Sequence, residues 1–285
     1  MTEQKDPLVL SCIDGSRYSG AVCDYAAWIA SRTGAPVKLL HNIERVSTPA
    51  VADLSGSIGL GSQEELLEEL ANLEQQRSKL LLEQGRQMLE RAKERAADAG
   101  AERVLTCQRH GSLVESLVEL EDHIRVLVLG IRGEEHEQQN RGLGAQLESI
   151  VRSLHKPILV VNREFKAPRS IMLAYDGSEA ARKALDMVAS SPVFKGIECH
   201  LVHVGEGAQS VLMEGAEALS HGGISVISAN LQGKTVDALI AYQQQHDIDL
   251  TVMGAFSHSK LRDLLLGSVT AKMLLGTKQP LLLLR

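Results

Sequence analysis

Runs of apolar residues recur along the chain, separated by longer stretches in which apolar positions have helical spacing. Two of these runs, VLVLG at 126–130 and PILVV at 157–161, consist almost wholly of apolar residues, which is typical of parallel strands buried on both faces. Strands that alternate with helices of this length predict an α/β fold with right-handed crossovers. We expect strands near residues 7–13, 37–43, 102–108, 125–129, 157–162, 169–175, 197–204, 223–229, 249–253 and 280–284.

The same pattern is written twice. LVLSCIDGS at Leu8–Ser16 is matched by IMLAYDGS at Ile171–Ser178, and KPILVVN at 156–162 by QPLLLLR at 279–285. A repeat of this length predicts tandem domains with one architecture. We expect two Rossmann-like domains, residues 1–164 and 165–285, each a five-stranded parallel sheet with helices on both faces.

The first half holds an insert of about 39 residues, because the repeat offset falls from 162 at its start to 123 at its end. A stretch rich in glycine and serine at 47–61 predicts a loop. Residues 62–100 then have a long helical pattern, with Ser62 and Glu65 placed as a capping box and Gly100 as a stop. This helix either covers its own sheet or offers a surface to a partner or to a second copy.

Composition narrows the classes of function. The net charge is −6 and no run of lysine or arginine is present, which argues against nucleic acid and anionic membranes as partners. We find no signal peptide and no stretch long and apolar enough for a membrane span. The four cysteines are scattered without a C-x-x-C pair, which is typical of buried free thiols in a reducing compartment. We therefore expect a cytoplasmic protein.

The strongest chemical signal lies in the second half. Gly254 ends a strand, and the spacing Gly-x-x-Ser followed by nine residues and Gly-Ser leads through Ser257 to Gly267 and Ser268. A glycine permits close backbone approach to a ligand, and a helix start offers free N–H groups to a phosphate. Asp176 ends the first strand of this half and should face the same crevice, where it can accept hydrogen bonds from a ribose or an adenine.

Both halves resemble domains of the universal stress protein family, on the two Asp-Gly-Ser starts, the two glycine loops and the two terminal strands that begin with proline. The family's loop reads Gly-x-x-Gly, nine residues, then Gly-Ser or Gly-Thr, and Ser257 stands at the second glycine. The resemblance implies a site for an adenosine nucleotide, ATP first, with or without Mg²⁺. In the second half it implies the nucleotide-binding residues Asp176, Val204, Gly254, Ser257, Gly267, Ser268 and Val269.

The first half departs further from the family's loop. Asp14, Gly130 and Gly133 are in place, but Gly144 comes one residue late and is followed by alanine. Glutamates at 134, 135 and 137 would lie beside a polyphosphate, where like charge is unfavourable. We treat Asp14, Gly130, Gly133 and Gly144 as a weaker second site, with packing as the alternative role for this half.

Three functions remain open on these observations. The first is a stress-response protein that binds an adenosine nucleotide in its second domain as a sensor or binding module. The second is a scaffold that recruits a protein partner without nucleotide, and the third is a slow ATPase. We assign no catalytic residue and no metal site. Either a homodimer or a pseudo-dimeric monomer fits a chain with two such domains.

Overall fold

The computed structural model describes residues 7–44, 60–131, 145–255 and 267–285. Each expected strand is present within three residues of its expected place. The first half contains β1 (Leu8–Cys12), α1 (Ser19–Thr33), β2 (Val37–Ile43), α2 (Leu60–Asp98), β3 (Val104–His110), α3 (Leu113–Leu120), η1 (Glu121–His123), β4 (Ile124–Gly130), α4 (Ala145–Ser153) and β5 (Ile158–Val161).

The second half repeats this order without the insert. It contains β6 (Ser170–Ala174), α5 (Glu179–Ser190), η3 (Pro192–Phe194), β7 (Glu198–Val204), α6 (Ala208–His221), β8 (Val226–Leu231), α7 (Thr235–Gln245), β9 (Leu250–Gly254), α8 (Ser268–Gly276) and β10 (Leu281–Leu284). The expected α/β fold with two tandem units is confirmed.

The strands of both halves join into one ten-stranded sheet in the order β3-β2-β1-β4-β5-β10-β9-β6-β7-β8. Pairing is parallel within each half and antiparallel between β5 and β10, where Leu159 lies opposite Leu282. These two leucines occupy the same position in the repeat, 123 residues apart, so the halves are related by an approximate two-fold axis through this pair. The halves therefore meet as the subunits of a symmetric dimer do.

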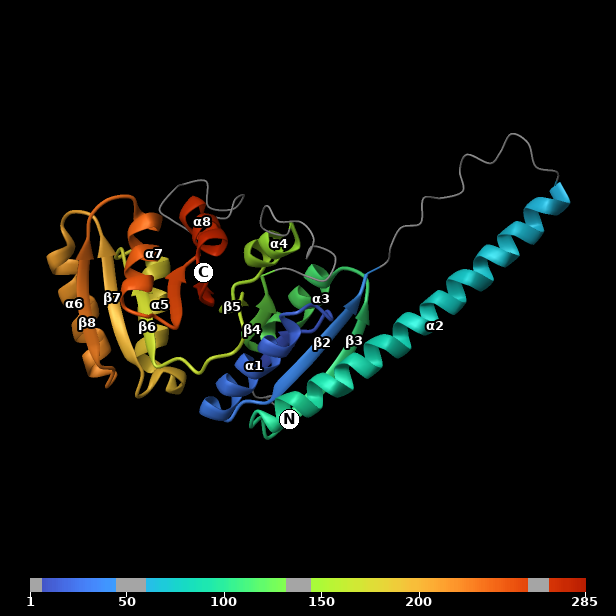
Figure 1. Cartoon of the computed structure of the whole chain (residues 1–285), viewed down its shortest axis with the longest axis horizontal. Coiled ribbons are helices and arrows are strands. Elements are labelled where there is room, and N and C mark those ends of the chain that lie inside the picture. The colour runs from blue at the N-terminus through green and yellow to red at the C-terminus, as the bar shows by residue number, and fades with distance from the viewer. Residues whose placement is uncertain (1–6, 45–59, 132–144, 256–266) are drawn as a thin grey trace.

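Helices cover both faces of the sheet (Figure 1). Successive strand residues point to opposite faces, so Val9 belongs to the core on the face covered by α1, α2, α5 and α6, while Leu10 belongs to the core on the face covered by α3, α4, α7 and α8. The fully apolar runs that mark the strands in the sequence supply both cores in this way. Side chains of valine, leucine, isoleucine and alanine make up most of each core.

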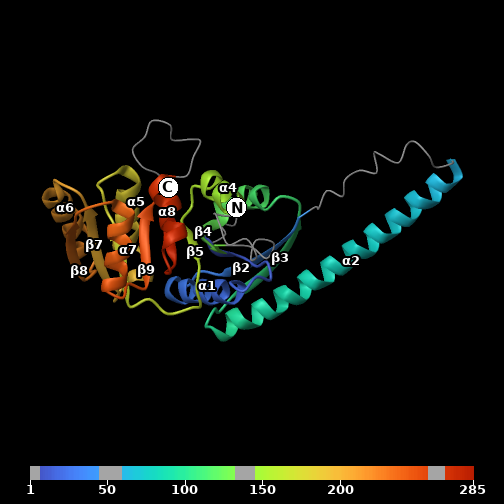
Figure 2. The ribbon, with the colours of Figure 1, turned by 45° about the horizontal axis from the view of Figure 1, so that its top comes forward.

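Helix α2 is attached to the sheet along only part of its length. Its C-terminal part buries Leu89, Ala92 and Ala96 against α1, β2 and β3. Further toward its N-terminus, Leu73 and Leu80 are 55% and 59% exposed. Figures 1 and 2 show this end standing away from the rest of the molecule. The helix thus covers its own sheet at one end and projects into solvent at the other.

The limits of α2 differ slightly from the expected ones. The helix begins at Leu60, so Ser62 lies inside it and the predicted capping box at Ser62 is wrong. At the other end, Gly100 has a φ of +98°, and its N–H donates to the carbonyl of Ala97. A left-handed glycine just past the last turn stops the helix, as predicted.

The segment between β5 and β6 is anchored to the second half. Asp249, which precedes β9 and is buried, accepts a hydrogen bond from the N–H of Arg169 at 2.9 Å and pairs with the ammonium of Lys166. Burial acts to raise the pKa of Asp249, but the bonds from Lys166 and Arg169 outweigh it and lower the pKa below its ordinary value.

Candidate functional site

A cavity of about 260 Å³ lies at the carboxyl ends of β6, β7 and β9. Strand β6 pairs with β9 on one side and with β7 on the other, so the chain leaves β6 at the point where the order of strands reverses. Crossover helices leave an open crevice at such a point in a parallel sheet, and ligands commonly bind there.

The floor of the cavity is apolar. Val202 and Val204 from the end of β7, Met253 from β9 and Leu239 from α7 line it, together with Ala174 at the end of β6. These side chains are buried or half-buried. A flat, apolar heterocycle would remove this surface from water on binding.

Asp176 supplies a carboxylate at one side of the cavity. It follows β6 in a turn where Gly177 has a φ of +74°, a backbone conformation that glycine adopts without strain. One carboxylate oxygen, Oδ1, accepts the N–H of Ser178 at 3.0 Å, and the Ser178 hydroxyl in turn caps α5 by accepting the N–H of Ala181. The turn therefore fixes Asp176 while its second oxygen stays available to a ligand.

Two helix N-termini border the cavity. Helix α8 begins behind Gly267 and helix α7 at Thr235, and neither has a side-chain cap for its first N–H groups. The hydroxyl of Thr270 donates to the carbonyl of Ala255 at 2.8 Å, which holds the start of α8 against the end of β9. Uncapped N–H groups and the positive ends of two helix dipoles favour an anion in this space.

Most of the predicted residues of the second half come together here. Asp176, Val204, Gly254, Gly267 and Val269 line the cavity. Ser268 is the exposed first residue of α8, next to the wall but not part of it, and Ser257 lies outside the described residues. The sequence analysis missed the lining residues Ala174, Tyr175, Ser178, Ala181, Val202, Thr235, Leu239, Met253 and Thr270.

Comparison with known proteins decides the family. The sequence model of the universal stress protein family matches residues 8–162 and 205–285. The chain belongs to the universal stress protein family. It is 36% identical to universal stress protein Slr1230 of Synechocystis over 284 residues, covering 97% of this chain and 99% of the relative.

Solved structures have the same fold. A universal stress protein from Archaeoglobus fulgidus superposes with a TM-score of 0.70 at 17% identity, covering 98% of this chain and 96% of its own. A putative universal stress protein from Pseudomonas aeruginosa superposes with a TM-score of 0.60 at 16% identity, covering 99% and 94%. The likeness therefore extends over both halves.

The first half of this universal stress protein has polar contacts across the corresponding crevice. Asp14 matches Asp176 in the repeat, but its Oδ1 accepts a hydrogen bond from the hydroxyl of Ser19 at 3.0 Å as well as one from the N–H of Ser16. The residue that matches Ser19 in the second half is Ala181, which has no such group. Asp14 is thus bound within its own turn.

Asn42 closes the same region from β2. It stands where the second half has Val204, donates to the carbonyl of Gly111 and accepts the hydroxyl of Ser116 at 3.1 Å. These bonds tie the end of β2 to the start of α3 across the place that matches the apolar floor. An adenine ring entering here would have to break them.

A third contact lies at the start of α4. Gln146, which matches Val269, donates to Glu44 beyond the end of β2. Gly130 ends β4 as expected, whereas Gly133 and Gly144 lie outside the described residues. Hydrogen bonds of Asn42 and Gln146 therefore span the weaker candidate site of the first half, and Ser19 bonds Asp14 within one turn, at three positions where the second half has apolar residues.

The cysteines offer no reactive thiol near either crevice. Burial, with the charge of Asp14 in second place, raises the pKa of Cys12 to about 12, and burial also raises the pKa of Cys199 to about 12. Such thiols stay protonated at neutral pH, and a protonated thiol is a poor nucleophile and a poor metal ligand.

Within the described ranges, no group of histidine, cysteine and carboxylate side chains is arranged to hold a metal ion. None of the helices described is both long and apolar enough to cross a membrane.

Proposed function

We propose that the second half of this universal stress protein binds an adenosine nucleotide, ATP first, and that the protein acts as a cytoplasmic sensor or binding module rather than an enzyme. The observation that carries the proposal is the cavity itself. It combines an apolar floor, a carboxylate on one side and two uncapped helix N-termini on another. These three features suit, in this order, the base, the ribose and the phosphates of a nucleotide.

In the proposed pose, adenine lies on Val202, Met253 and Leu239 and contacts the backbone of Val204. The free carboxylate oxygen of Asp176 accepts a hydrogen bond from a ribose hydroxyl or from the adenine amino group. The phosphates extend toward Gly267 and the start of α8, where N–H groups and the helix dipole offset their charge. Asp176 is the one carboxylate among the lining residues that the structure describes, so Mg²⁺ would arrive with the phosphates.

We propose further that the first half, residues 1–164, binds no nucleotide. Its crevice is crossed by the bonds of Asn42 and Gln146. Opening it would leave the buried hydroxyl of Ser116, which donates to Asn42, without this partner, at a cost of about 1–3 kcal/mol. The nucleotide-binding site then belongs to the second domain, residues 165–285, and one nucleotide binds per chain.

A partner-recruiting scaffold is the second candidate, favoured by the exposed leucines of α2. Leu73 and Leu80 are seven residues apart on the part of the helix that projects from the sheet. A helix with exposed leucines at this spacing offers a surface to another helix. This role would accompany nucleotide binding rather than replace it. A slow ATPase has no support from the described residues, because no general base lies beside the helix N-termini.

Replacing Asp176 tests the proposed function. The Asp176→Ala protein loses the acceptor for the ribose or adenine, so we expect ATP affinity to fall about ten- to a hundredfold, the value of a hydrogen bond to a charged group. Asp14→Ala, the matched change in the first half, should leave ATP affinity unchanged. Isothermal titration calorimetry with ATP and Mg²⁺ measures both. Equal affinities for Asp176→Ala and the unaltered protein would contradict the proposed site.

A further inference from the structure

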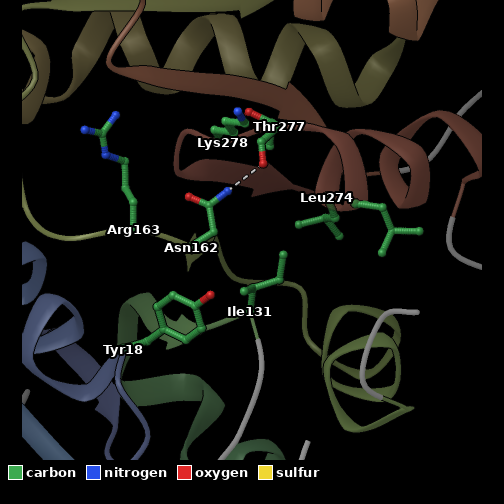
Figure 3. Close-up of a pocket in the computed structure, with 8 residues that line it drawn as sticks. Tyr18, Ile131, Asn162, Arg163, Leu274, Thr277 and Lys278 are labelled. Carbon is green, nitrogen blue, oxygen red and sulfur yellow. Dashed lines mark hydrogen bonds between the residues drawn. The ribbon is translucent and has the colours of Figure 1, made fainter. Parts of the chain in front are cut away.

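A second and larger cavity, of about 530 Å³, lies where the two halves meet. Figure 3 shows side chains from both halves facing one space. Ile131 follows β4 and Leu274 lies on α8. The residues that line this cavity differ from those that line the nucleotide crevice, so the two are separate, although α8 borders both. The first half contributes Tyr18, Ile131, Asn162 and Arg163, and the second half Leu274, Leu275, Thr277 and Lys278.

The approximate two-fold axis explains why this space is open. Asn162 follows β5, and Arg285 occupies the matching position after β10, 123 residues later. On its side of the axis, the long side chain of Arg285 reaches α4 and donates to the carbonyl of Arg152. Leu275 matches Arg152, so an arginine at position 162 would reach the wall of the cavity. The shorter Asn162 leaves that volume unfilled.

Asn162 is held in one orientation. Its Nδ2 donates to the carbonyls of Thr277 and Gln279, both at 3.0 Å, and Figure 3 shows the bond to Thr277. Two carbonyl partners fix the nitrogen on that side, so the other atom of the amide must be the oxygen. That oxygen is buried and has no partner among the described residues. The amide nitrogen of Asn162 is thus held by backbone carbonyls, and its amide oxygen is left without a described hydrogen-bond partner.

The rest of the wall combines cations with apolar surface. Arg163 is half-buried and bonds Gln279 through one guanidinium nitrogen, at 2.5 Å, which leaves further donors. Lys278 is exposed, and no ion-pair or hydrogen-bond partner is described for its ammonium. Opposite them, the half-buried Ile131 and the exposed Leu275 offer aliphatic surface, whereas Leu274 is buried in the core. Two cations beside an apolar wall, with no carboxylate among the lining residues that the structure describes, favour a ligand that is anionic at one end and apolar at the other.

We propose that this interdomain cavity is a binding site for a small organic anion, with a carboxylate or phosphate directed to Arg163 and Lys278 and an apolar body against Ile131 and Leu275. The site requires both halves, because each supplies one cation and part of the apolar wall. It is independent of the nucleotide site, and a nucleotide in the second half would leave it accessible.

The test uses 3-phenylpropionate as the probe and the neutral 3-phenylpropanamide as its comparison. Calorimetric titration of the full chain, with and without ATP, should show saturable binding of the anion at one site per chain and much weaker binding of the amide. Arg163→Met should weaken probe binding at least about tenfold, because it removes the half-buried cation and its remaining donors while keeping a side chain of similar length. ATP affinity and melting temperature report whether this variant is folded.

A matched pair of lysine variants provides a second test if Arg163→Met does not fold. Lys278→Ala should weaken probe binding about three- to fivefold, as the loss of one exposed charge pair does. Lys272→Ala removes the same charge from an exposed position of α8 outside the cavity and should have no effect. The proposal is overturned if the chain binds no probe at millimolar concentration. It is also overturned if Arg163→Met binds as tightly as the unaltered chain, or if the two lysine variants weaken binding equally.

Discussion

At the scale of single residues, Gly254 illustrates how a site motif acts through packing. A Cβ at this position would lie 2.8 Å from the Cβ of Ala180 and 3.2 Å from the backbone nitrogen of Ala181. Glycine is therefore required by the first turn of α5, which passes over the end of β9. By allowing that approach, Gly254 brings the turn that carries Asp176 close to the start of α8.

Replacing Gly254 should cost stability for this reason. We expect Gly254→Ala to lower the free energy of unfolding by about 1–3 kcal/mol, the usual cost of overpacking against backbone. Gly276→Ala is the control, because its Cβ would meet only the Cδ1 of Ile240, the end of a side chain that can rotate away. That change should be neutral or slightly stabilising, since alanine favours the helix. Urea denaturation measures both, and equal stabilities would show that the contact with α5 does not matter.

The sequence predicted the polar part of the site better than its apolar part. Asp176 and Gly267 stand out because Asp-Gly-Ser and Gly-Ser interrupt apolar runs at fixed spacing. Met253 and Leu239 line the same cavity but carry no such signal, since an apolar residue at the end of a strand or on a helix looks the same whether it faces a ligand or the core. Position along a strand does not reveal which side chains a crevice exposes.

At the scale of elements, the helix pattern of residues 62–100 predicted α2 but not its path. The periodic leucines indicate a helix over their whole length, whereas only the part around Leu89, Ala92 and Ala96 packs on α1 and the sheet. Intrinsic propensity forms a helix, but tertiary contacts decide where it lies. The exposed leucines nearer its N-terminus therefore had no predicted partner.

Asp249 is a buried carboxylate that holds the linker between the halves. The stability that its contacts contribute to the fold should therefore vary with pH. The pKa of Asp249 is lower in the folded protein than its ordinary value of 3.8. A lowered folded pKa contributes stability that is fully present above the unfolded pKa and is lost as the pH falls through the folded pKa. The Lys166 and Arg169 contacts should therefore stabilise the fold at neutral pH and not in strong acid.

Asp249→Asn tests this linkage. At pH 7 we expect the variant to be less stable by about 1–3 kcal/mol, because the hydrogen bonds to a charged acceptor are weakened. The difference from the unaltered protein should shrink below pH 3.8 as Asp249 becomes protonated in both states. Thermal unfolding followed by circular dichroism over a pH series measures it. A difference that is constant from neutral to acid pH would contradict a charged role for Asp249.

At the scale of the molecule, the repeat predicted two related units but not that their sheets join. Parallel order within each half follows from strands that alternate with helices. The strands β5 and β10, which contain PILVV and PLLLL, end the two halves and pair antiparallel. Their apolar pattern indicates burial but does not predict which strand each one pairs with. Once paired, these two edges are no longer exposed, which favours the pseudo-dimeric monomer over the homodimer.

In the proposed account, the two halves differ in nucleotide binding because side chains are exchanged within one fold. The same fold places an apolar crevice in the second half and a hydrogen-bonded one in the first, through the exchanges Ala181 for Ser19, Val204 for Asn42 and Val269 for Gln146. Divergence at a few positions has thus left one crevice open. The number of nucleotides bound per chain is therefore the quantity that best tests the account.

That number can be measured by denaturing purified protein, counting the released nucleotide, and titrating the stripped chain with ATP. We predict one adenosine nucleotide per chain, and none for Gly267→Val, whose added side chain enters the phosphate region while its backbone φ of −53° suits any residue. Gly276→Ala, at the far end of the same helix, should retain full binding. Two nucleotides per chain, or no binding at millimolar ATP by a folded protein, would contradict a single live site in the second half.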